Sequence, residues 1–355
     1  MPTLSLVMIA KNESATLARC LDSVVPLVDE IILVDTGSTD NTKEIALSYQ
    51  ARVFDFEWNQ NFAEARNYAL ERSTSDWNLV LDADEYISND CGQAIRQFMD
   101  GGQAIGRVKR IDKYQDKNGV AYAQCFISRL FPRGLYYKGR IHEQVQSDLP
   151  RVKLSVEVQH DGYYQKVKSG RNIPILQLEI QDHPNDPYYH YQIAKEYKGI
   201  DDHNAAYLHL QEAYKRITRQ EMYAPYVIVN LLYEILATGH LEEGLQLIER
   251  EKEFLWEFSD FHFASGVFYL DLIMSNTAKY INYLPQIEQS YLRCLEIGET
   301  DQYDSVIGTG SFAALHNLGV FYEVTGNKEK ASTCYKEAAI LNYEPSMTRL
   351  NLLMN

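Results

Sequence analysis

Cysteine is scarce in this chain: it has five, and no two of them form a CxxC pair. The odd number and the lack of close pairs favour reduced thiols over a disulfide framework. Reduced thiols are typical of a reducing compartment, and we therefore expect a cytoplasmic protein.

Long hydrophobic runs are also missing, since none approaches the roughly 20 apolar residues of a membrane span. The first residues, MPTLSLVMIAKNES, hold one short apolar run before Lys11. A signal peptide would begin with basic residues and end at a small-residue cleavage site, and neither is present. We expect this segment to be a strand, and we expect no membrane span.

Basic residues are outnumbered, with 34 Lys and Arg against 49 Asp and Glu, for a net charge of −15. A nucleic acid partner is disfavoured, because a protein with this charge would release few counterions from a phosphate backbone. What remains is an ordinary globular composition over 355 residues, 45% of them hydrophobic and 23% charged. That length and composition predict about two domains.

The first 110 residues or so alternate between two patterns. Apolar segments rich in Val, Ile and Leu predict buried strands at 4–10, 30–35, 51–58 and 77–83. Apolar residues at helical spacing predict helices at 15–27, 40–50 and 61–73. Buried strands separated by helices predict a parallel, Rossmann-like sheet covered on both faces. From 104 to about 164 the pattern becomes β-rich.

From about residue 183 helical periodicity dominates and tyrosine is abundant. In the stretch 314–345, small residues such as Gly319 and Ala338 alternate with aromatic ones across two helical segments joined by TGN. This pattern resembles a tetratricopeptide repeat. Looser copies run through 194–213 and 229–250, and 260–299 fits a third copy with an insertion. We predict a stacked helical repeat domain over 183–355, joined to a first domain over 1–182 by QDHPNDP at 181–187.

Two carboxylates, Asp82 and Asp84, end the fourth predicted strand in the motif LVLDADE. A solvated acidic turn is the simpler interpretation, because short DxD triplets are common. The place of the motif at the carboxyl edge of a parallel sheet, where ligands bind, favours a site for Mg²⁺ or Mn²⁺. Such a cation can neutralise the charge of a phosphate leaving group.

Two further segments supply polar side chains near that edge. Asp40 and Thr42 are explained by capping the helix that follows, but capping does not explain Asp35, at the mouth of a buried strand. A carboxylate there can accept a hydrogen bond from a nucleobase. Arg66 lies on a helix with an apolar face; it either pairs with a surface Glu or binds a diphosphate or base.

Taken in order, the motifs SLVMIAKNES, ILVDTGSTDNT, FAEARNYAL and LVLDADE resemble glycosyltransferase family 2, with the GT-A fold. The resemblance continues through ISRLF, YYKGRIHEQV and HDGYY, and covers about residues 3 to 175. Within the family it is nearest to bacterial cytosolic enzymes that often end in tetratricopeptide repeats, some of which glycosylate bacteriocin peptides. Others in that branch resemble lipopolysaccharide-core glucosyltransferases.

The resemblance implies roles for individual residues. It implies that the backbone of Ala10 and Lys11 and the side chain of Asp35 hold the uracil of a UDP-sugar, with Arg66 beside the base or diphosphate. It implies that Asp82 and Ala83 face the ribose or metal and that Asp84 binds Mn²⁺ or Mg²⁺. Thr36 departs from the family, where a second Asp is common. Glu85 receives no role.

The family inverts the anomeric carbon, so a base must take the proton of the acceptor. The motif RIHEQV offers Glu143 for this role, with His142 as the next candidate, although the two residues would also fit a solvent-exposed strand end. His160 is either a structural histidine or, as in other GT-A enzymes, the residue that completes the metal shell.

The leading hypothesis is an inverting, metal-dependent glycosyltransferase that moves a hexose or N-acetylhexosamine from a UDP-sugar to Ser, Thr or Cys of a peptide or protein. The repeats would recruit that acceptor or form a homodimer. One alternative is an enzyme acting on lipopolysaccharide or another cell-envelope glycan. The other is a non-catalytic repeat scaffold.

Overall fold

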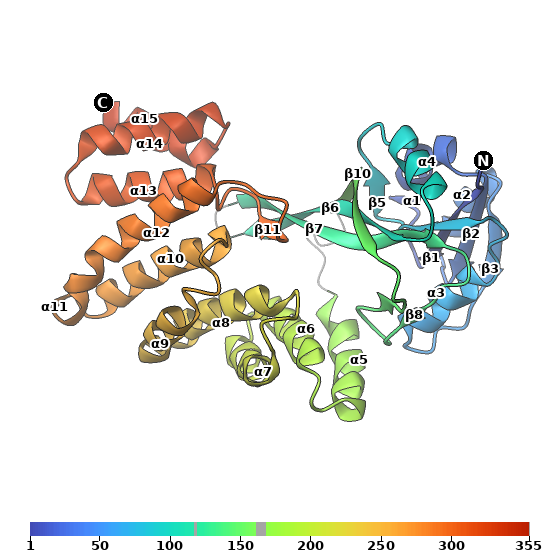
Figure 1. Cartoon of the computed structure of the whole chain (residues 1–355), viewed down its shortest axis with the longest axis horizontal. Helices are drawn as coiled ribbons and strands as arrows, with labels where there is room; N and C mark the ends of the chain where they lie inside the picture. Colours follow the sequence, from blue (N-terminus) through green and yellow to red (C-terminus); the bar gives the residue numbers. More distant parts are fainter. Residues whose placement is uncertain (117–118, 161–167, 355) are drawn as a thin grey trace. The chain divides into compact units, whose positions relative to one another are not determined.

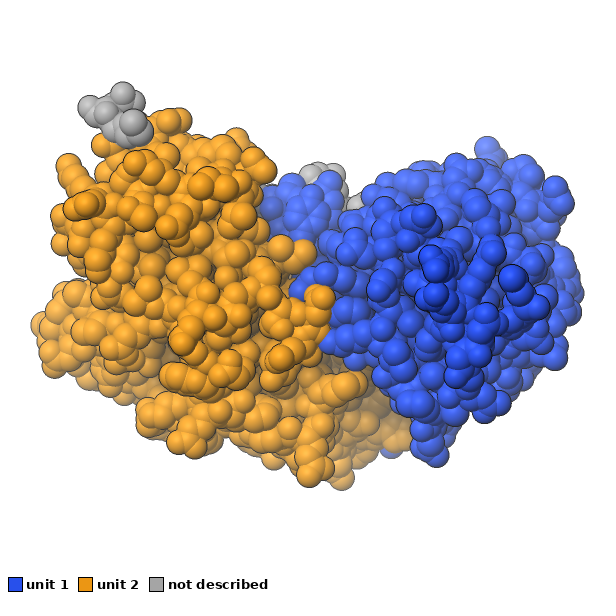
Figure 2. Space-filling view, turned by 45° about the horizontal axis from the view of Figure 1, so that its top comes forward, with its two compact units in different colours: residues 1–182 blue, residues 183–355 orange. Residues whose placement is uncertain are grey.

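The computed structural model describes residues 1–116, 119–160 and 168–354, and the chain divides into two compact units, Met1–Asp182 and His183–Asn355. Figure 1 follows the elements along the chain, and Figure 2 colours the two units. The first unit is α/β and the second is built of helices. No helix within the described ranges is long and apolar enough to cross a membrane.

The first unit follows the predicted alternation of strands and helices. Its strands are β1 (Leu4–Ala10), β2 (Glu30–Asp35), β3 (Arg52–Asp55), β4 (Trp77–Val80), β5 (Glu85–Ile87), β6 (Ile105–Asp116), β7 (Gly119–Pro132), β8 (Tyr137–Lys138), β9 (Gln144–Val145) and β10 (Arg151–His160). Its helices are α1 (Leu17–Val24), the 3₁₀ turn η1 (Val25–Leu27), α2 (Thr42–Ser48), α3 (Phe62–Leu70), α4 (Gly92–Asp100) and α5 (Ser169–Asp182).

The main sheet runs in the order β3-β2-β1-β4-β7-β6-β10-β5. Strands β3, β2, β1 and β4 are parallel, so their carboxyl ends share one edge, with Ala10 opposite Asp35 in the register. The long hairpin β6–β7 continues the sheet in antiparallel fashion beyond β4. The short strands β8 and β9 form a separate antiparallel pair. The predicted fold, a mostly parallel α/β domain followed by a helical one, is confirmed.

The sheet is covered on both faces because successive side chains of its buried strands point in opposite directions. On β1, Leu6 and Met8 join one hydrophobic cluster with Leu21 of α1. Val7, between them, joins the cluster on the other face with Leu70 of α3. Strands β1, β2 and β4 are mostly apolar for that reason, as the sequence pattern predicts. The prediction of a buried strand is wrong for β3, RVFD, which is exposed at both ends, Arg52 and Asp55, and only partly buried between them.

The second unit consists of helices that contact their neighbours in sequence. They are α6 (Pro187–Lys198), α7 (His203–Arg216), α8 (Ala224–Thr238), α9 (Leu241–Glu251), α10 (Ser259–Ser275), α11 (Thr277–Tyr280), η2 (Ile281–Tyr283), α12 (Leu284–Ile297), α13 (Phe312–Val324), α14 (Lys328–Ile340) and α15 (Glu344–Met354), with the short strand β11 (Ser305–Val306) before α13. The predicted insertion near 277–285 forms α11 and η2 between the long helices α10 and α12.

Glycine and tyrosine explain how these helices pack. A Cβ on Gly319 of α13 would lie 2.6 Å from the ring of Tyr335 on α14, so only glycine allows this approach. Buried tyrosines keep their hydroxyls satisfied by donating to a glutamate on another helix, as Tyr322 does to Glu288 at 2.6 Å and Tyr335 to Glu323 at 2.8 Å. These pairs account for part of the tyrosine content of the repeats.

Asp260 of α10 makes the stability of the helical unit depend on pH. Its buried carboxylate accepts hydrogen bonds from the Thr309 hydroxyl at 2.5 Å and from the Val306 amide at 3.1 Å. Burial nevertheless raises its pKa to about 6. A raised pKa in the folded state means that stability is greatest below the unfolded value and is lost as pH rises through about 6.

Asp260→Asn is therefore expected to stabilise the helical unit at pH 7, by up to about 3 kcal/mol, because the amide carries no charge to desolvate. Urea unfolding at several pH values measures the effect. Between about pH 4 and 6 the wild-type free energy of unfolding should fall more steeply than that of the variant. The exposed Asp301→Asn is the control, and a variant whose pH profile matches wild type would show that Asp260 is not responsible.

Candidate functional site

The candidate site lies where β1, β2 and β4 end, at the carboxyl edge of the parallel half of the sheet. Asp35 is the last residue of β2, Lys11 follows β1, and Asp82 and Asp84 follow β4. These positions belong to strands that neighbour one another in the sheet. The sequence predicted this gathering, because each of these residues directly follows or ends a strand of a parallel sheet, where ligands bind.

The carboxylate of Asp35 is almost completely buried, and its two oxygens differ. Oδ2 accepts hydrogen bonds from the amides of Gly37 at 3.0 Å and Ser38 at 2.9 Å, and lies 3.7 Å from Nζ of Lys43. Oδ1 is buried without a hydrogen-bond partner. Since an unsatisfied buried oxygen is costly, Oδ1 is suited to accept from a ligand.

The loops after β1 and β2 interlock around Asp35. Thr36 donates its amide and its hydroxyl to the carbonyl of Ala10, at 2.9 and 3.2 Å. Thr36 therefore fastens the two loops where the family often has an acidic residue. Lys11 is exposed at the mouth of the site. Asp40 accepts from the amides of Ser14 and Thr42, at 3.0 and 3.1 Å, although the N-cap position of α2 is Asn41.

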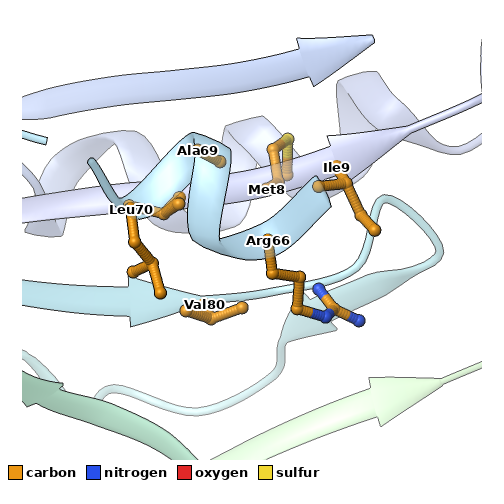
Figure 3. Close-up of a pocket in the computed structure, with 7 residues that line it drawn as sticks. Met8, Ile9, Arg66, Ala69, Leu70 and Val80 are labelled. Carbon is orange, nitrogen blue, oxygen red and sulfur yellow. The ribbon is translucent and has the colours of Figure 1, made fainter. Parts of the chain in front are cut away.

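Arg66 comes from the buried face of α3 and connects two carboxylates. Its Nη2 donates to Oδ1 of Asp82 at 2.7 Å, and its Nε donates to Oε1 of Glu143. Figure 3 shows the side chain extending away from Ala69 and Leu70, so that the guanidinium lies past Val80, the end of β4. Nη1 of Arg66 is buried without a hydrogen-bond partner.

Asp82 lies between two arginines. Besides Arg66, Arg129 of β7 donates through Nη2 to Oδ2 of Asp82 at 2.8 Å. Burial alone would raise the pKa of Asp82, but Arg66 and Arg129 outweigh it and hold that pKa well below its usual range. Arg129 also contacts both oxygens of the buried Glu85, at 2.9 and 3.1 Å. Glu85, which the sequence left without a role, is thus the second carboxylate that binds Arg129, after Asp82.

Asp84 faces a different pair of cations. Its Oδ1 lies 3.6 Å from Nε2 of His160, and its Oδ2 lies 3.4 Å from Nζ of Lys168. Burial raises the pKa of Asp84, but His160 and Lys168 lower it to about 2. Burial lowers the pKa of His160, but its contacts with the carboxylates of Asp112 and Asp84 raise it to about 9.

Glu143 lies between β8 and β9, and its side chain is 10% exposed. The segment before it is fastened on both sides: the Phe62 amide of α3 donates to the carbonyl of Arg140 at 2.7 Å, and Arg140 donates its amide to the buried Glu179 of α5 at 2.5 Å. His142 has a left-handed backbone, with φ of 54°. His142 and Glu143 are thus not a solvent-exposed strand end.

The structure therefore joins Arg66, Asp82 and Glu143 in one ion-pair network, and joins Asp84 to His160. Ala83, between the two aspartates, is buried. The motif HDGYY extends beyond His160 into 161–164, which lie outside the described residues. Sequence reasoning missed Arg129, Asp112 and Lys168. A charged residue directly before the apolar pair Leu130 and Phe131 in ISRLF was a usable signal for Arg129.

The topology and the acidic carboxyl edge are those of a GT-A type α/β domain, and the comparison with known families agrees. Residues 5–149 match the family described as Glycosyl transferase family 2. The first unit therefore contains a region similar to glycosyltransferase family 2.

Two relatives extend the likeness beyond that region. A TPR repeat-containing protein of Synechococcus elongatus is 32% identical over 206 residues, which are 53% of this chain and 50% of the relative. The SPbeta prophage-derived glycosyltransferase SunS of Bacillus subtilis is 24% identical over 296 residues, which are 76% of this chain and 68% of that protein. This chain thus spans about half the length of the cyanobacterial relative.

Among solved structures, glucosyl-3-phosphoglycerate synthase from Mycobacterium tuberculosis, in complex with Mn²⁺, UDP and phosphoglyceric acid, is 29% identical. The match covers 33% of this chain and 45% of that one, with a TM-score of 0.27.

Proposed function

We propose that this protein transfers a hexose or N-acetylhexosamine from a UDP-sugar, with inversion, to a Ser, Thr or Cys side chain of a peptide or protein. The observation that carries the proposal is the carboxyl edge of a domain similar to family 2, where Asp84 lies against His160 while Asp82 and Glu143 share Arg66. An unrelated acidic turn would have no reason to place two carboxylates on one buried guanidinium.

The donor set beside Asp84 fits a divalent cation. Asp84 offers carboxylate oxygens and His160 an imidazole nitrogen, both from buried side chains, and both are ligands that Mn²⁺ accepts. Over the described ranges, no three or more His, Cys, Asp or Glu side chains gather as a complete metal site. Two protein ligands, Asp84 and His160, suit a cation that also binds substrate phosphates, since Mg²⁺ is usually held by one or two carboxylates plus phosphate oxygens. When bound, the cation would supply positive charge to the diphosphate leaving group.

For Asp82, the two arginines occupy both carboxylate oxygens. We therefore assign the metal to Asp84 and His160. A contact between Asp82 and the ribose stays a prediction.

The residues of this chain then have separate roles in binding the donor and in the transfer step. Asp35 would accept the N3 hydrogen of uracil through Oδ1, with the backbone at Ala10 and Lys11 beside the base. The acceptor oxygen or sulfur forms a bond to the anomeric carbon while the bond from that carbon to the diphosphate oxygen breaks. Glu143 takes the proton of the acceptor, and Arg66 orients the Glu143 carboxylate through Nε.

The helical unit supports a peptide acceptor over a small molecule. Stacked helical repeats form extended surfaces that bind peptides, and the cyanobacterial relative is itself named for such repeats. A cell-envelope glycan is the second candidate acceptor. Incubating a peptide panel with UDP-glucose and UDP-N-acetylglucosamine, with Mn²⁺ or EDTA, followed by mass spectrometry, tests the proposal. If no condition gives either sugar transfer or UDP-sugar hydrolysis, the enzyme hypothesis is rejected in favour of a repeat scaffold.

Asp35→Ala should weaken UDP binding by roughly 1.5–3 kcal/mol, the cost of a hydrogen bond to a charged group. Calorimetric titration with UDP measures this. Asp55→Ala is the matched control, because Asp55 pairs with the same Lys43 yet is exposed at the end of β3. If both variants bind UDP as wild type does, Asp35 does not contact the base.

A further inference from the structure

Strand β10 brings His160 between two acidic residues from neighbouring strands. In the register, His160 lies opposite Asp112 of the parallel strand β6 and opposite Glu85 of the antiparallel strand β5. Residues opposite each other in a sheet project their side chains to the same face. His160 therefore shares a face of the sheet with both acidic residues, and its imidazole contacts Asp112.

The contact with Asp112 sets which nitrogen of His160 keeps its hydrogen when a cation displaces the hydrogen of the other nitrogen. Nδ1 lies 2.5 Å from Oδ1 of Asp112, and Nε2 lies 3.6 Å from Oδ1 of Asp84. An ionised carboxylate only accepts hydrogen bonds, so Nδ1 is the donor. Nε2 is then the nitrogen directed at Asp84.

Asp112 is held in place by Arg110, two residues earlier on β6. Nε of Arg110 lies 2.9 Å from Oδ1 of Asp112, and Nη2 donates to Oδ2 at 3.1 Å. Nη1 of the same arginine lies 3.5 Å from Oε1 of Glu85. The hydrogen bond from Nη2 and the ion pair through Nε hold the Asp112 carboxylate beside the imidazole of His160.

We propose that Asp112 is a positioning residue that keeps hydrogen on Nδ1 of His160 and so presents Nε2, beside Asp84, as a ligand for the divalent cation. A histidine that binds a metal through one nitrogen usually donates its other N–H to a carboxylate, carbonyl or water, and the loss of that partner costs 10–100-fold in metal affinity or activity. The inference rests on the proposed function, because it concerns the cation that would accompany a UDP-sugar.

The test is Mn²⁺ affinity of the full chain in the presence of UDP, measured by the electron paramagnetic resonance signal of free Mn²⁺. Asp112→Ala should raise the Mn²⁺ dissociation constant about 10–100-fold. Asp112→Asn keeps an accepting oxygen and should lose less affinity. Glu157→Gln is the matched control: it removes a charge from the same strand, three residues from His160 and so on the opposite face.

A spectroscopic readout separates positioning from general stabilisation. Electron spin echo modulation of bound Mn²⁺ should show coupling to an imidazole nitrogen in wild type and in Glu157→Gln, and the coupling should vanish in Asp112→Ala and in His160→Ala. Asp112→Asn should retain it.

Unchanged affinity and unchanged nitrogen coupling in Asp112→Ala would overturn the inference and leave the proposed function standing. If Asp112→Ala does not fold, Asp112→Asn decides: loss of the nitrogen coupling there would overturn the inference, because its amide oxygen still accepts from Nδ1. Wild-type protein that binds UDP but no Mn²⁺ would overturn both the inference and the metal dependence of the proposed function. UDP affinity measured without metal should be the same in all variants. This control distinguishes a failure of the inference about Asp112 from a failure of the proposed function.

Discussion

Asp84→Ala is expected to remove most transfer activity, on the order of 10²–10⁴-fold in kcat, while UDP still binds. The reason is that a cation stabilises the departing diphosphate by several kcal/mol, and each 1.36 kcal/mol is a factor of ten in rate. Asp84 supplies the carboxylate for that cation in the proposed site, next to His160. The measurement is steady-state transfer at saturating UDP-sugar, with calorimetry to follow UDP binding without metal.

The fold should survive this change, because His160 keeps its contact with Asp112 when the Asp84 carboxylate is removed. Asp100→Ala, at the exposed end of α4, is the control for loss of an acidic residue. EDTA should reduce wild-type activity as much as the substitution does. If EDTA leaves the rate unchanged, or Asp84→Ala turns over like wild type, the metal assignment is wrong.

The position of this site could be predicted because strand pattern alone determines it. Segments such as LSLVMIA and EIILVD are apolar at most positions, including neighbouring residues that point to opposite faces, as a strand covered on both faces requires, and the structure has them as β1 and β2. Ligands of such sheets bind at the carboxyl edge. The predictions that Asp35, Asp82 and Asp84 share this edge follow from where each strand ends.

The partners of those residues could not be predicted, because they depend on strand order beyond the parallel half. Asp112 meets His160 only because β10 inserts between β6 and β5, and nothing local in the sequence specifies that order. Likewise Asp82 and Asp84 are two residues apart but contact different cations, since they lie in a turn after β4 where strand alternation does not apply.

Arg66 is the residue whose proposed role changes most when its contacts are known. The family resemblance implied a contact with the base or diphosphate. In the structure its guanidinium binds Asp82, which follows β4, and Glu143, which lies between β8 and β9. A single buried cation thereby ties the carboxylate that follows β4 to the proposed base, so a change at Arg66 should affect both substrates.

Glu143→Gln should reduce transfer to serine or threonine roughly 10²–10⁴-fold, the usual contribution of general-base catalysis. The glutamine keeps the size of the side chain and an oxygen that Nε of Arg66 can bind, but it takes no proton at neutral pH. An alcohol is almost entirely protonated at pH 7, so its attack depends on the base. UDP affinity should hardly change, since the base faces the acceptor.

The same substitution should behave differently with a cysteine acceptor. A thiol with a pKa near 8.5 is already a few per cent thiolate at pH 7, so it needs less help from a base. Transfer to cysteine should therefore fall less and recover in part as pH rises. Matched Ser and Cys peptides, assayed from about pH 6.5 to 9, separate the two cases. If Glu143→Gln retains wild-type transfer to both peptides, Glu143 is not the base, and His142, which precedes it in the same segment between β8 and β9, becomes the residue to replace next.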